Sequence, residues 1–283
     1  MKSSWKNKSI QVFLKKEIPL NLFTKISVKT YFKKTFGFIL DIIFPSKCFK
    51  CGFFLSGLEN RSICPTCLNQ IGLIKPPFCG ICGKPFGFQY DLSNEDSYWC
   101  GACRTETNYF DKVRSLGKYE GFFKEALINY KYRGRREILK DLIRICFLPK
   151  KNNFIPQKKA ADKADGLDII IYVPLHKKKL RTRGFDQAFL IAKEISKLSN
   201  VPLKADFLFK EIETIPQAAL KKQIRKNNLK GVFAVRNRNS LEGKNVLLVD
   251  DVITTGTTVN ECSKILKQNG ANRVEVFTLA RAV

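Results

Sequence analysis

Residues 246–258, VLLVDDVITTGTT, join an apolar strand, two acids, a threonine-rich turn and the start of a helix. In a parallel α/β sheet, ligands bind beyond the carboxyl ends of the strands, and this strand ends in Asp250 and Asp251. Small residues around Gly256 allow a tight turn, so that several N–H groups converge on one anion beside a helix N-terminus. The two carboxylates suit ribose hydroxyls and, through water, a hydrated Mg²⁺. The stretch therefore predicts a cradle for a phosphate that carries a ribose.

This pattern differs from two common phosphate loops, because a Walker A loop ends in GK[ST] and a dinucleotide turn reads GxGxxG. A capped turn with two incidental acids is the structural alternative. The stretch resembles the phosphoribosyl-pyrophosphate (PRPP) loop of type I phosphoribosyltransferases. By that resemblance, Asp250 and Asp251 are the catalytic acids that hold the ribose hydroxyls. The 5′-phosphate is then bound by the residues of the turn, Thr254, Thr255, Gly256, Thr257 and Thr258.

Apolar strands alternate with amphipathic helices through the second half of the chain. Strands are expected at 168–174, 245–251 and 273–280, with helices at 185–198 and 257–270. Upstream, 113–121 is typical of a strand, and 122–132 and 136–147 are typical of helices. Continuous apolar strands between helices predict an α/β fold, a parallel sheet covered on both faces.

A basic stretch precedes the helix at 185–198. The sequence IIIYVPLHKKKLRTRGFDQAF (169–189) runs from a strand into an expected loop with five cations within 177–183. A loop at the end of a neighbouring strand faces the same crevice as the cradle, where its cations would neutralise a pyrophosphate. A solvated basic turn is the alternative. We expect Asp186 in the first turn of the following helix, and we expect His176, the only histidine, to be structural.

Eight of the ten cysteines form four CxxC pairs. The first two pairs are separated by 12 residues and the last two by 17, a spacing typical of tetrahedral zinc–thiolate sites. The expected ligands are Cys48, Cys51, Cys64, Cys67, Cys79, Cys82, Cys100 and Cys103. A four-cysteine zinc site has no open coordination position, so we expect one or two structural zinc ions in a double zinc ribbon. An iron–sulfur cluster, a redox dithiol and interleaved pairing are alternatives.

Glycines and the two remaining cysteines complete this interpretation. Gly52 and Gly83 follow the first knuckle of each ribbon, where we expect them to form tight turns. Cys146 and Cys262 lie in expected helices without partners at ligand spacing, and we expect them to be buried as small apolar groups. Thiolates available for metal indicate a reducing compartment, so we expect a cytoplasmic protein.

Charge and length set broader limits. The 283 residues carry a net charge of +26, which favours anionic partners, although an AT-rich genome would equally produce a lysine-rich chain. No apolar run approaches the roughly 20 residues that span a membrane, so no transmembrane segment is expected. Residues 1–35 form an expected basic N-terminal extension, for which an over-called start codon or a weak targeting sequence are alternatives. Residues 150–166 have the composition of a linker or surface insertion.

The order of motifs resembles the ComF family of competence proteins over residues 36–283. The CxxC pairs are followed by YKYRGR, VPLHKKKLRTRGFDQA, TIPQAALKKQIRKNNLKGVF and then the PRPP loop. This resemblance implies a short helix and double zinc ribbon at 36–110 and a phosphoribosyltransferase-like domain at 111–283. It assigns to the pyrophosphate side Lys177, Arg183, Gly184 and Gln187. It assigns to a flexible loop over the site Gln217, Arg225 and Asn228.

Two positions depart from the family pattern. The family usually has Asn where this chain has Asp186, and a basic residue where it reads Glu211-Ile-Glu213. These departures affect fine substrate contacts and leave the fold expectation unchanged. The last expected strand ends close to Val283, so we expect no C-terminal hood to read a base, and the sequence names no acceptor.

Three functions fit these observations. The first is a transferase, in which a nucleophile displaces pyrophosphate from PRPP with Mg²⁺. The second is a non-catalytic PRPP-fold protein that handles single-stranded DNA in natural transformation, together with other competence proteins. The third is a PRPP-sensing zinc-ribbon regulator. Single-strand binding is suggested by the cations Lys221, Lys222, Arg225, Lys226 and Lys230 and by the ribbon aromatics Phe53, Phe54, Phe78, Phe86, Phe88, Tyr90 and Tyr98.

Overall fold

The computed structural model describes residues 46–55, 61–87, 98–147, 166–210, 231–236 and 240–283. Lys47–Val283 form one compact unit. The expected helix at 36–44, the linker, and the flexible-loop residues Gln217, Arg225 and Asn228 lie outside the described residues. In the described part of the chain, no helix combines the length and apolarity needed to cross a membrane.

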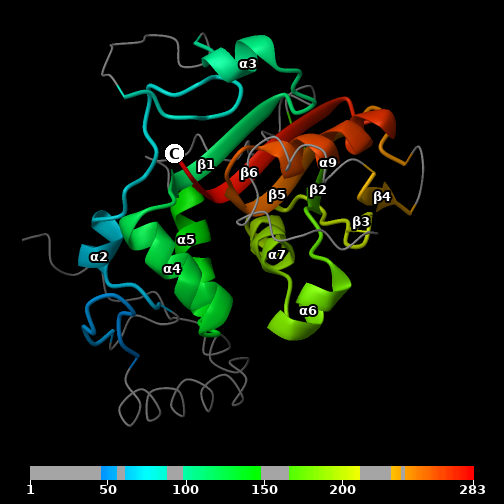
Figure 1. Cartoon of the computed structure of the whole chain (residues 1–283). Coiled ribbons are helices and arrows are strands. Elements are labelled where there is room, and N and C mark those ends of the chain that lie inside the picture. Colours follow the sequence, from blue (N-terminus) through cyan, green and yellow to red (C-terminus); the bar gives the residue numbers. More distant parts are fainter. Residues whose placement is uncertain (1–45, 56–60, 88–97, 148–165, 211–230, 237–239) are drawn as a thin grey trace, which may run out of the picture. The chain divides into compact units, whose positions relative to one another are not determined.

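Four parallel strands form the central sheet, in the order β1-β6-β5-β2 (Figure 1). They are β1 (Lys112–Lys118), β2 (Ile169–Tyr172), β5 (Asn245–Ile253) and β6 (Arg273–Arg281). The register pairs Tyr172 with Val249 and Asp250 with Thr278. The segment that follows β2 therefore begins beside the acids at the end of β5. This arrangement confirms the expected α/β fold with a parallel sheet.

Side chains of β5 alternate between two hydrophobic cores. Leu247 and Val249 pack in the core that contains α4, α5 and α7, whereas Val246 and Leu248 pack in the core that contains α9. Because successive residues of a strand point to opposite faces, helices must cover both sides of this sheet. These helices are α4 (Gly121–Tyr132), α5 (Glu137–Cys146), α7 (Gln187–Ser199) and α9 (Thr257–Gln268), as the sequence periodicity predicts to within two residues at each end.

The basic stretch after β2 corrects one expectation, because it is helical rather than a loop. Helix α6 (Lys177–Arg183) begins at His176, whose side chain accepts a hydrogen bond from the amide of Lys178. It ends at Gly184, which has φ 71° and caps the helix in the left-handed conformation that glycine tolerates. These caps explain how a short run of like charges stays helical. His176 is structural, as expected.

A second sheet was not expected from the sequence. Strands β3 (Leu208–Lys210) and β4 (Phe233–Val235) pair antiparallel and pack against α9 and β5 through Leu208 and Phe233. Each strand has three residues, which is too short for a period-two pattern to be recognised in the sequence.

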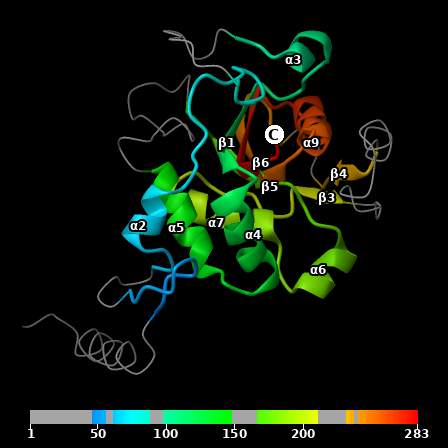
Figure 2. The ribbon, with the colours of Figure 1, turned by 60° about the vertical axis from the view of Figure 1, so that its left-hand side comes forward.

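The two cysteine-rich segments pack into opposite cores. Cys48, Ile63 and Ile71 of the first segment join the core of α4, α5 and α7, whereas Cys79 and Phe110 join the core of α9. The short helix of the first segment, α2 (Pro65–Asn69), lies beside α5 in both ribbon views (Figure 2), and its Leu68 packs against the core of α4, α5 and α7. The second segment contains α3 (Gly101–Thr105). Each segment therefore completes the cover of one face of the sheet.

A buried carboxylate joins the first segment to α5. Asp141 Oδ2 accepts hydrogen bonds from the amide of Ser62 at 2.7 Å, the hydroxyl of Ser62 at 3.0 Å and the amide of Ile63 at 3.2 Å. Asp141 and Ser62 are 5% and 4% exposed, so water does not compete for these donors. The carboxylate satisfies backbone groups that would otherwise be buried without an acceptor.

Replacing this carboxylate should destabilise the fold. Asp141→Leu leaves two buried amides without an acceptor, and we expect a loss of about 2–4 kcal/mol in the free energy of unfolding. Denaturant unfolding followed by circular dichroism measures this loss. Glu137→Leu is the matched control, because Glu137 is exposed on the same helix. Equal stability of the two variants would contradict the proposed role of Asp141.

Candidate functional site

An acid pair and a lysine form the centre of the site. Asp250 and Asp251 end the apolar part of β5, and Asp250 Oδ1 accepts the amide of Asp251 at 2.8 Å. Lys131 Nζ, from the last turn of α4, lies 2.7 Å from Asp251 Oδ2, with only 14% and 17% of the two side chains exposed. Burial, and then the charge of Asp251, raise the pKa of Asp250 well above its usual value. Burial alone would lower the pKa of Lys131, but the charges of Asp251 and Asp250 outweigh it and raise that pKa.

The turn after β5 combines a glycine N-cap with threonine hydroxyls. Gly256 is the N-cap of α9 with φ 83°, a conformation that a side chain with a Cβ rarely adopts. The hydroxyls of Thr255 and Thr257 lie 2.9 Å apart. A depression of about 20 Å³ is lined by Asp250 and by residues 252–259. The start of an α-helix leaves amides without helical acceptors, so this turn presents donors to an anion.

The connection between α6 and α7 faces the acid pair. Asp186 is the N-cap of α7 rather than a member of its first turn: its Oδ1 accepts the amide of Phe189 and its Oδ2 accepts the amide of Leu175. Burial raises the pKa of Asp186, and the charge of Asp251 adds to the effect. Arg183 donates to Gln187 Oε1 at 3.2 Å. Both carboxylate oxygens accept backbone amides here, so this position suits an aspartate better than an asparagine.

One cavity of about 390 Å³ brings six of the expected site residues together, but Gly184, Thr255, Gly256 and Thr257 do not line it. Its lining includes Arg183, Asp186, Gln187, Asp250, Asp251, Thr254 and Thr258, together with Lys131 and Tyr119. Lys177 does not line this cavity and is exposed on α6. Gln187 is 3% exposed, and its Nε2 has no hydrogen-bond partner among the described residues. A buried donor without a partner at the cavity wall is consistent with a ligand that supplies an acceptor.

Lys131 is the site residue that sequence reasoning missed. It belongs to the motif YKYRGR, which was recognised only as a mark of the family and received no chemical role. Its position four residues after the apolar Leu127 on an expected helix was the available signal. The partner Asp251 is 120 positions away in the sequence, so helix periodicity does not reveal the ion pair.

Both cysteine clusters fit zinc. Within each set of four, the sulfur atoms all lie within 4.8 Å of one another. The Sγ atoms of Cys51 and Cys64 are 3.7 Å apart, as are those of Cys82 and Cys100. Four sulfurs at 2.3 Å from a tetrahedral Zn²⁺ would be about 3.8 Å apart. The clusters use consecutive CxxC pairs, so the ligands do not interleave.

Backbone amides donate to a sulfur in each cluster, and the thiols of one cluster differ in pKa: that of Cys79 is lowered, whereas a hydrogen bond to Cys79 and burial raise that of Cys82. The amides of Cys67 and Cys100 each donate to a cluster sulfur at 3.3 Å. A hydrogen bond from Cys82, opposed by burial, lowers the pKa of Cys79 to about 4. Gly52 and Gly83 have φ 74° and 69°, as the predicted knuckle turns require. Cys146 and Cys262 are buried in α5 and α9, as expected, and belong to neither cluster.

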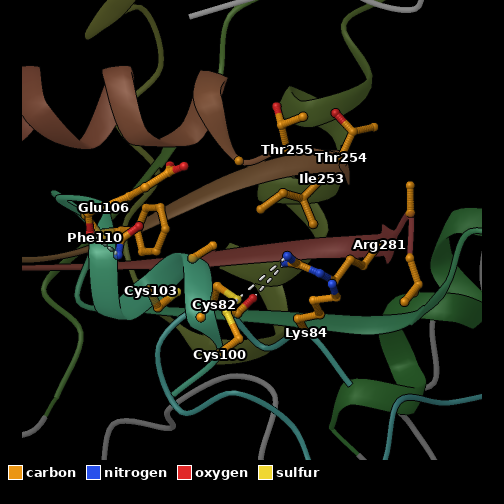
Figure 3. A pocket seen from close by; sticks show the side chains of 16 residues that line it. Cys82, Lys84, Cys100, Cys103, Glu106, Phe110, Ile253, Thr254, Thr255 and Arg281 are labelled. Carbon is orange, nitrogen blue, oxygen red and sulfur yellow. Dashed lines mark hydrogen bonds between the residues drawn. The ribbon is translucent and has the colours of Figure 1, made fainter. Parts of the chain in front are cut away.

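The second cluster is attached to the end of the sheet beside the cradle (Figure 3). Arg281, which is 7% exposed, donates from one guanidinium nitrogen to the carbonyl of Cys82 at 2.7 Å, and another lies 3.7 Å from its Sγ. The next amide, of Ala282, donates to the carbonyl of Ile253 at 2.9 Å. Asn260 of α9 also accepts the amide of Tyr109 at 2.8 Å. The second cysteine cluster and the turn after β5 are therefore connected by a network of hydrogen bonds.

Comparison with known families agrees with this two-part organisation. Residues 39–104 match the double zinc ribbon domain, and residues 187–282 match the phosphoribosyl transferase domain. The first match contains all eight cysteines of the two clusters. The second contains α7, the acid pair, the cradle and β6.

Similar proteins cover most of the chain. Competence protein F of Haemophilus influenzae is 30% identical over 240 residues, which are 84% of this chain and 98% of that protein. DNA utilization protein YhgH of Escherichia coli K12 is 28% identical over 84% of this chain and 98% of that protein. Competence protein ComFC of Bacillus subtilis is 28% identical over 79% of this chain and 85% of that protein.

The metal content should follow from the two clusters. Protein purified under reducing conditions should carry close to two zinc ions per chain, because each cluster supplies four thiolates at tetrahedral spacing. Elemental analysis measures the stoichiometry. Cys48→Ser and Cys79→Ser should each remove close to one zinc ion, whereas Cys146→Ala should keep both. Iron in place of zinc, or one zinc ion in a fully folded wild-type sample, would overturn the assignment of two zinc sites.

Proposed function

This chain belongs to the ComF family of competence proteins, and from that premise we propose that it binds PRPP with Mg²⁺ at the carboxyl end of β5. The observation that carries the proposal is the cavity of about 390 Å³, which is lined by the acid pair, by Arg183 and by Thr254 and Thr258 at the two ends of the threonine turn. A ligand for this cavity needs hydroxyls for the carboxylates and anionic groups for the turn and the arginine. A phosphoribosyl compound with a pyrophosphate offers ribose hydroxyls to the acids, a 5′-phosphate to the turn and a pyrophosphate to the arginine.

Each part of PRPP has a proposed partner. The 5′-phosphate binds the turn Thr254–Thr258, where amides and hydroxyls donate. The ribose hydroxyls bind Asp250 and Asp251, and these acids hold Mg²⁺ through water. The pyrophosphate lies toward Arg183, Gly184 and Gln187, where the unpartnered Nε2 of Gln187 would gain an acceptor. Bound Mg²⁺ supplies charge that stabilises pyrophosphate as it leaves.

Transfer of the phosphoribosyl group is the activity that this arrangement would support. Arg183 and the turn would hold the two phosphorylated ends of the ligand, so that the ribose carbon between them is fixed against the acid pair. Pyrophosphate release in the presence of PRPP and candidate acceptors tests transfer. We also propose a reducing compartment, the cytoplasm, because thiolates remain available for zinc there.

PRPP binding should stabilise the folded protein. A ligand at 100 times its Kd that binds only the folded state adds about 2.7 kcal/mol, which should raise the melting temperature by several degrees in a thermal shift assay. Asp250→Asn should reduce this Mg²⁺-dependent shift, because an amide provides less negative charge for the ribose–Mg²⁺ contact. Gly256→Val should abolish it, because a β-branched residue is strained at φ 83°.

The control for these variants is Asp168→Asn. Asp168 accepts the amide of Asn245 at the opposite end of the sheet, and an asparagine oxygen can accept the same bond. Its thermal shift should equal that of the wild type. If the wild-type protein shows no Mg²⁺-dependent shift with PRPP or with ribose 5-phosphate, the proposed binding function is wrong.

Binding of single-stranded DNA is a second proposed function, favoured by exposed aromatic side chains on the ribbons. Phe53 and Phe54 are 62% and 52% exposed, and Lys47 Nζ lies 4.8 Å from the ring centroid of Phe54. Tyr98 and Trp99 are 45% and 49% exposed. Exposed rings beside cations bind single strands by stacking with bases and pairing with phosphates. The names of the relatives, which refer to competence and DNA utilization, agree with this function.

The structure changes the set of rings available for stacking. Phe78 was expected to contribute, but it is only 7% exposed. The guanidinium carbon of Arg114 lies 4.7 Å from the centroid of its ring. Trp99 was not included in the sequence-based set and is half-exposed. Phe88, Tyr90 and the cations at 221–230 lie outside the described residues.

Removing rings and removing cations should affect DNA binding differently. Replacing Tyr98 and Trp99 together by Ala should weaken binding of an oligothymidylate by about 1–3 kcal/mol for each base that loses its stacking partner. Neutralising the five cations at 221–230 should instead flatten the dependence of log K on log[salt]. Fluorescence anisotropy across a salt series measures both effects. Leu198→Ala, an exposed apolar position on α7, is the control. An unchanged slope would mean that these cations do not contact DNA.

A further inference from the structure

The last turn of α4 contacts three separate parts of the cavity wall. Tyr130 is buried, and its hydroxyl donates to the carbonyl of Gln187 at 3.2 Å. Lys131 pairs with Asp251. The hydroxyl of Tyr132 accepts a hydrogen bond from Arg183 at 3.3 Å, and the guanidinium lies 5.4 Å from the centroid of its ring. Successive residues of a helix point about 100° apart, so one tripeptide reaches both the acid side and the basic side of the cavity.

The pairing of Lys131 conflicts with the proposed role of Asp251. The ammonium lies 2.7 Å from Asp251 Oδ2, with both side chains largely buried. A ribose hydroxyl or a hydrated Mg²⁺ on this carboxylate would compete with the ammonium for the same oxygen. A lysine that leaves a partly buried carboxylate needs another anion, because an unpaired charge in a largely buried place is unfavourable.

The same cavity contains the position for such an anion. Arg183 and Gln187 line it together with Lys131 and Asp251. Its volume of about 390 Å³ leaves room for a phosphate group between Lys131 and Arg183. Lysine has a flexible four-carbon chain and a point-like charge, so it can move from a carboxylate to a phosphate without a change of backbone.

We propose that Lys131 is an exchangeable counter-ion that pairs either with Asp251 or with the pyrophosphate of the ligand, and so selects pyrophosphorylated ribose over plain ribose 5-phosphate. This inference rests on the proposed function and adds a specificity residue to it. PRPP with Mg²⁺ supplies both a partner for Asp251 and an anion for Lys131. Ribose 5-phosphate supplies only the first and leaves the displaced ammonium unpaired.

Isothermal titration of PRPP and of ribose 5-phosphate, each with Mg²⁺, tests the proposal. Lys131→Met should weaken PRPP binding roughly ten- to a hundredfold, the range expected for a charged hydrogen bond. Binding of ribose 5-phosphate should be unchanged or tighter, because the competitor for Asp251 is removed. Lys124→Met, at an exposed position of the same helix, should behave as the wild type. Equal weakening of both ligands, or no change in either, would overturn the proposal.

A second measurement uses the wild-type protein and does not depend on the folding of a variant. Amine acetylation is followed at Lys131 by mass spectrometry, with Lys124 as the internal reference. Ribose 5-phosphate with Mg²⁺ should increase labelling of Lys131, because the ammonium is displaced from Asp251, whereas PRPP with Mg²⁺ should decrease it. Equal labelling with both ligands would contradict the exchange. If the wild type binds neither ligand, the proposed function itself fails, which the titrations of the wild type alone reveal.

Discussion

Two adjacent carboxylates at the end of a buried strand require compensation, and the site is built around that requirement. Asp250 and Asp251 follow an apolar run of β5 and lie near a third acid, Asp186. Their mutual repulsion and burial would favour protonation. Lys131 from α4 and the backbone amide that binds Asp250 offset this tendency. The two acids thus depend on the packing of α4 against the sheet, because this packing brings Lys131 to them.

The ribbons contribute to the same arrangement by covering the sheet. The first is attached through Asp141 to α5, which packs beside α4 and α7. The second is attached through Arg281 and Asn260 to the strand end and the helix that flank the cradle. A loop-rich segment of this size has little core of its own, and zinc would replace that missing core energy. Zinc in the second ribbon would therefore also hold Arg281 and the strand end beside the proposed phosphate cradle in place, although no cysteine of that ribbon lies among the proposed ligand contacts.

Much of the architecture could be predicted because its signals are contiguous. The apolar runs at 169–172 and 246–249 are continuous, as expected for strands buried on both faces, and the helices show period 3.6. The failures have equally specific causes. Helix α6 was expected as a loop because five cations mask the caps at His176 and Gly184. Phe78 was expected to be exposed, but Arg114 covers it. Strands β3 and β4 are too short to carry a pattern.

The sequence by itself determined the two four-cysteine clusters, the acid pair and the threonine turn, since each of these depends on residues close together in the chain. Tertiary structure alone decided which distant groups meet them. Lys131 and Asp251 are 120 positions apart, and Arg281 and Cys82 are separated by 199. Neither pair has a local signal, because the contacts arise only when helices and ribbons pack on opposite faces of one parallel sheet. Spacing along the chain specifies a metal or phosphate motif, whereas the counter-ions of that motif are specified by the packing that brings them to it.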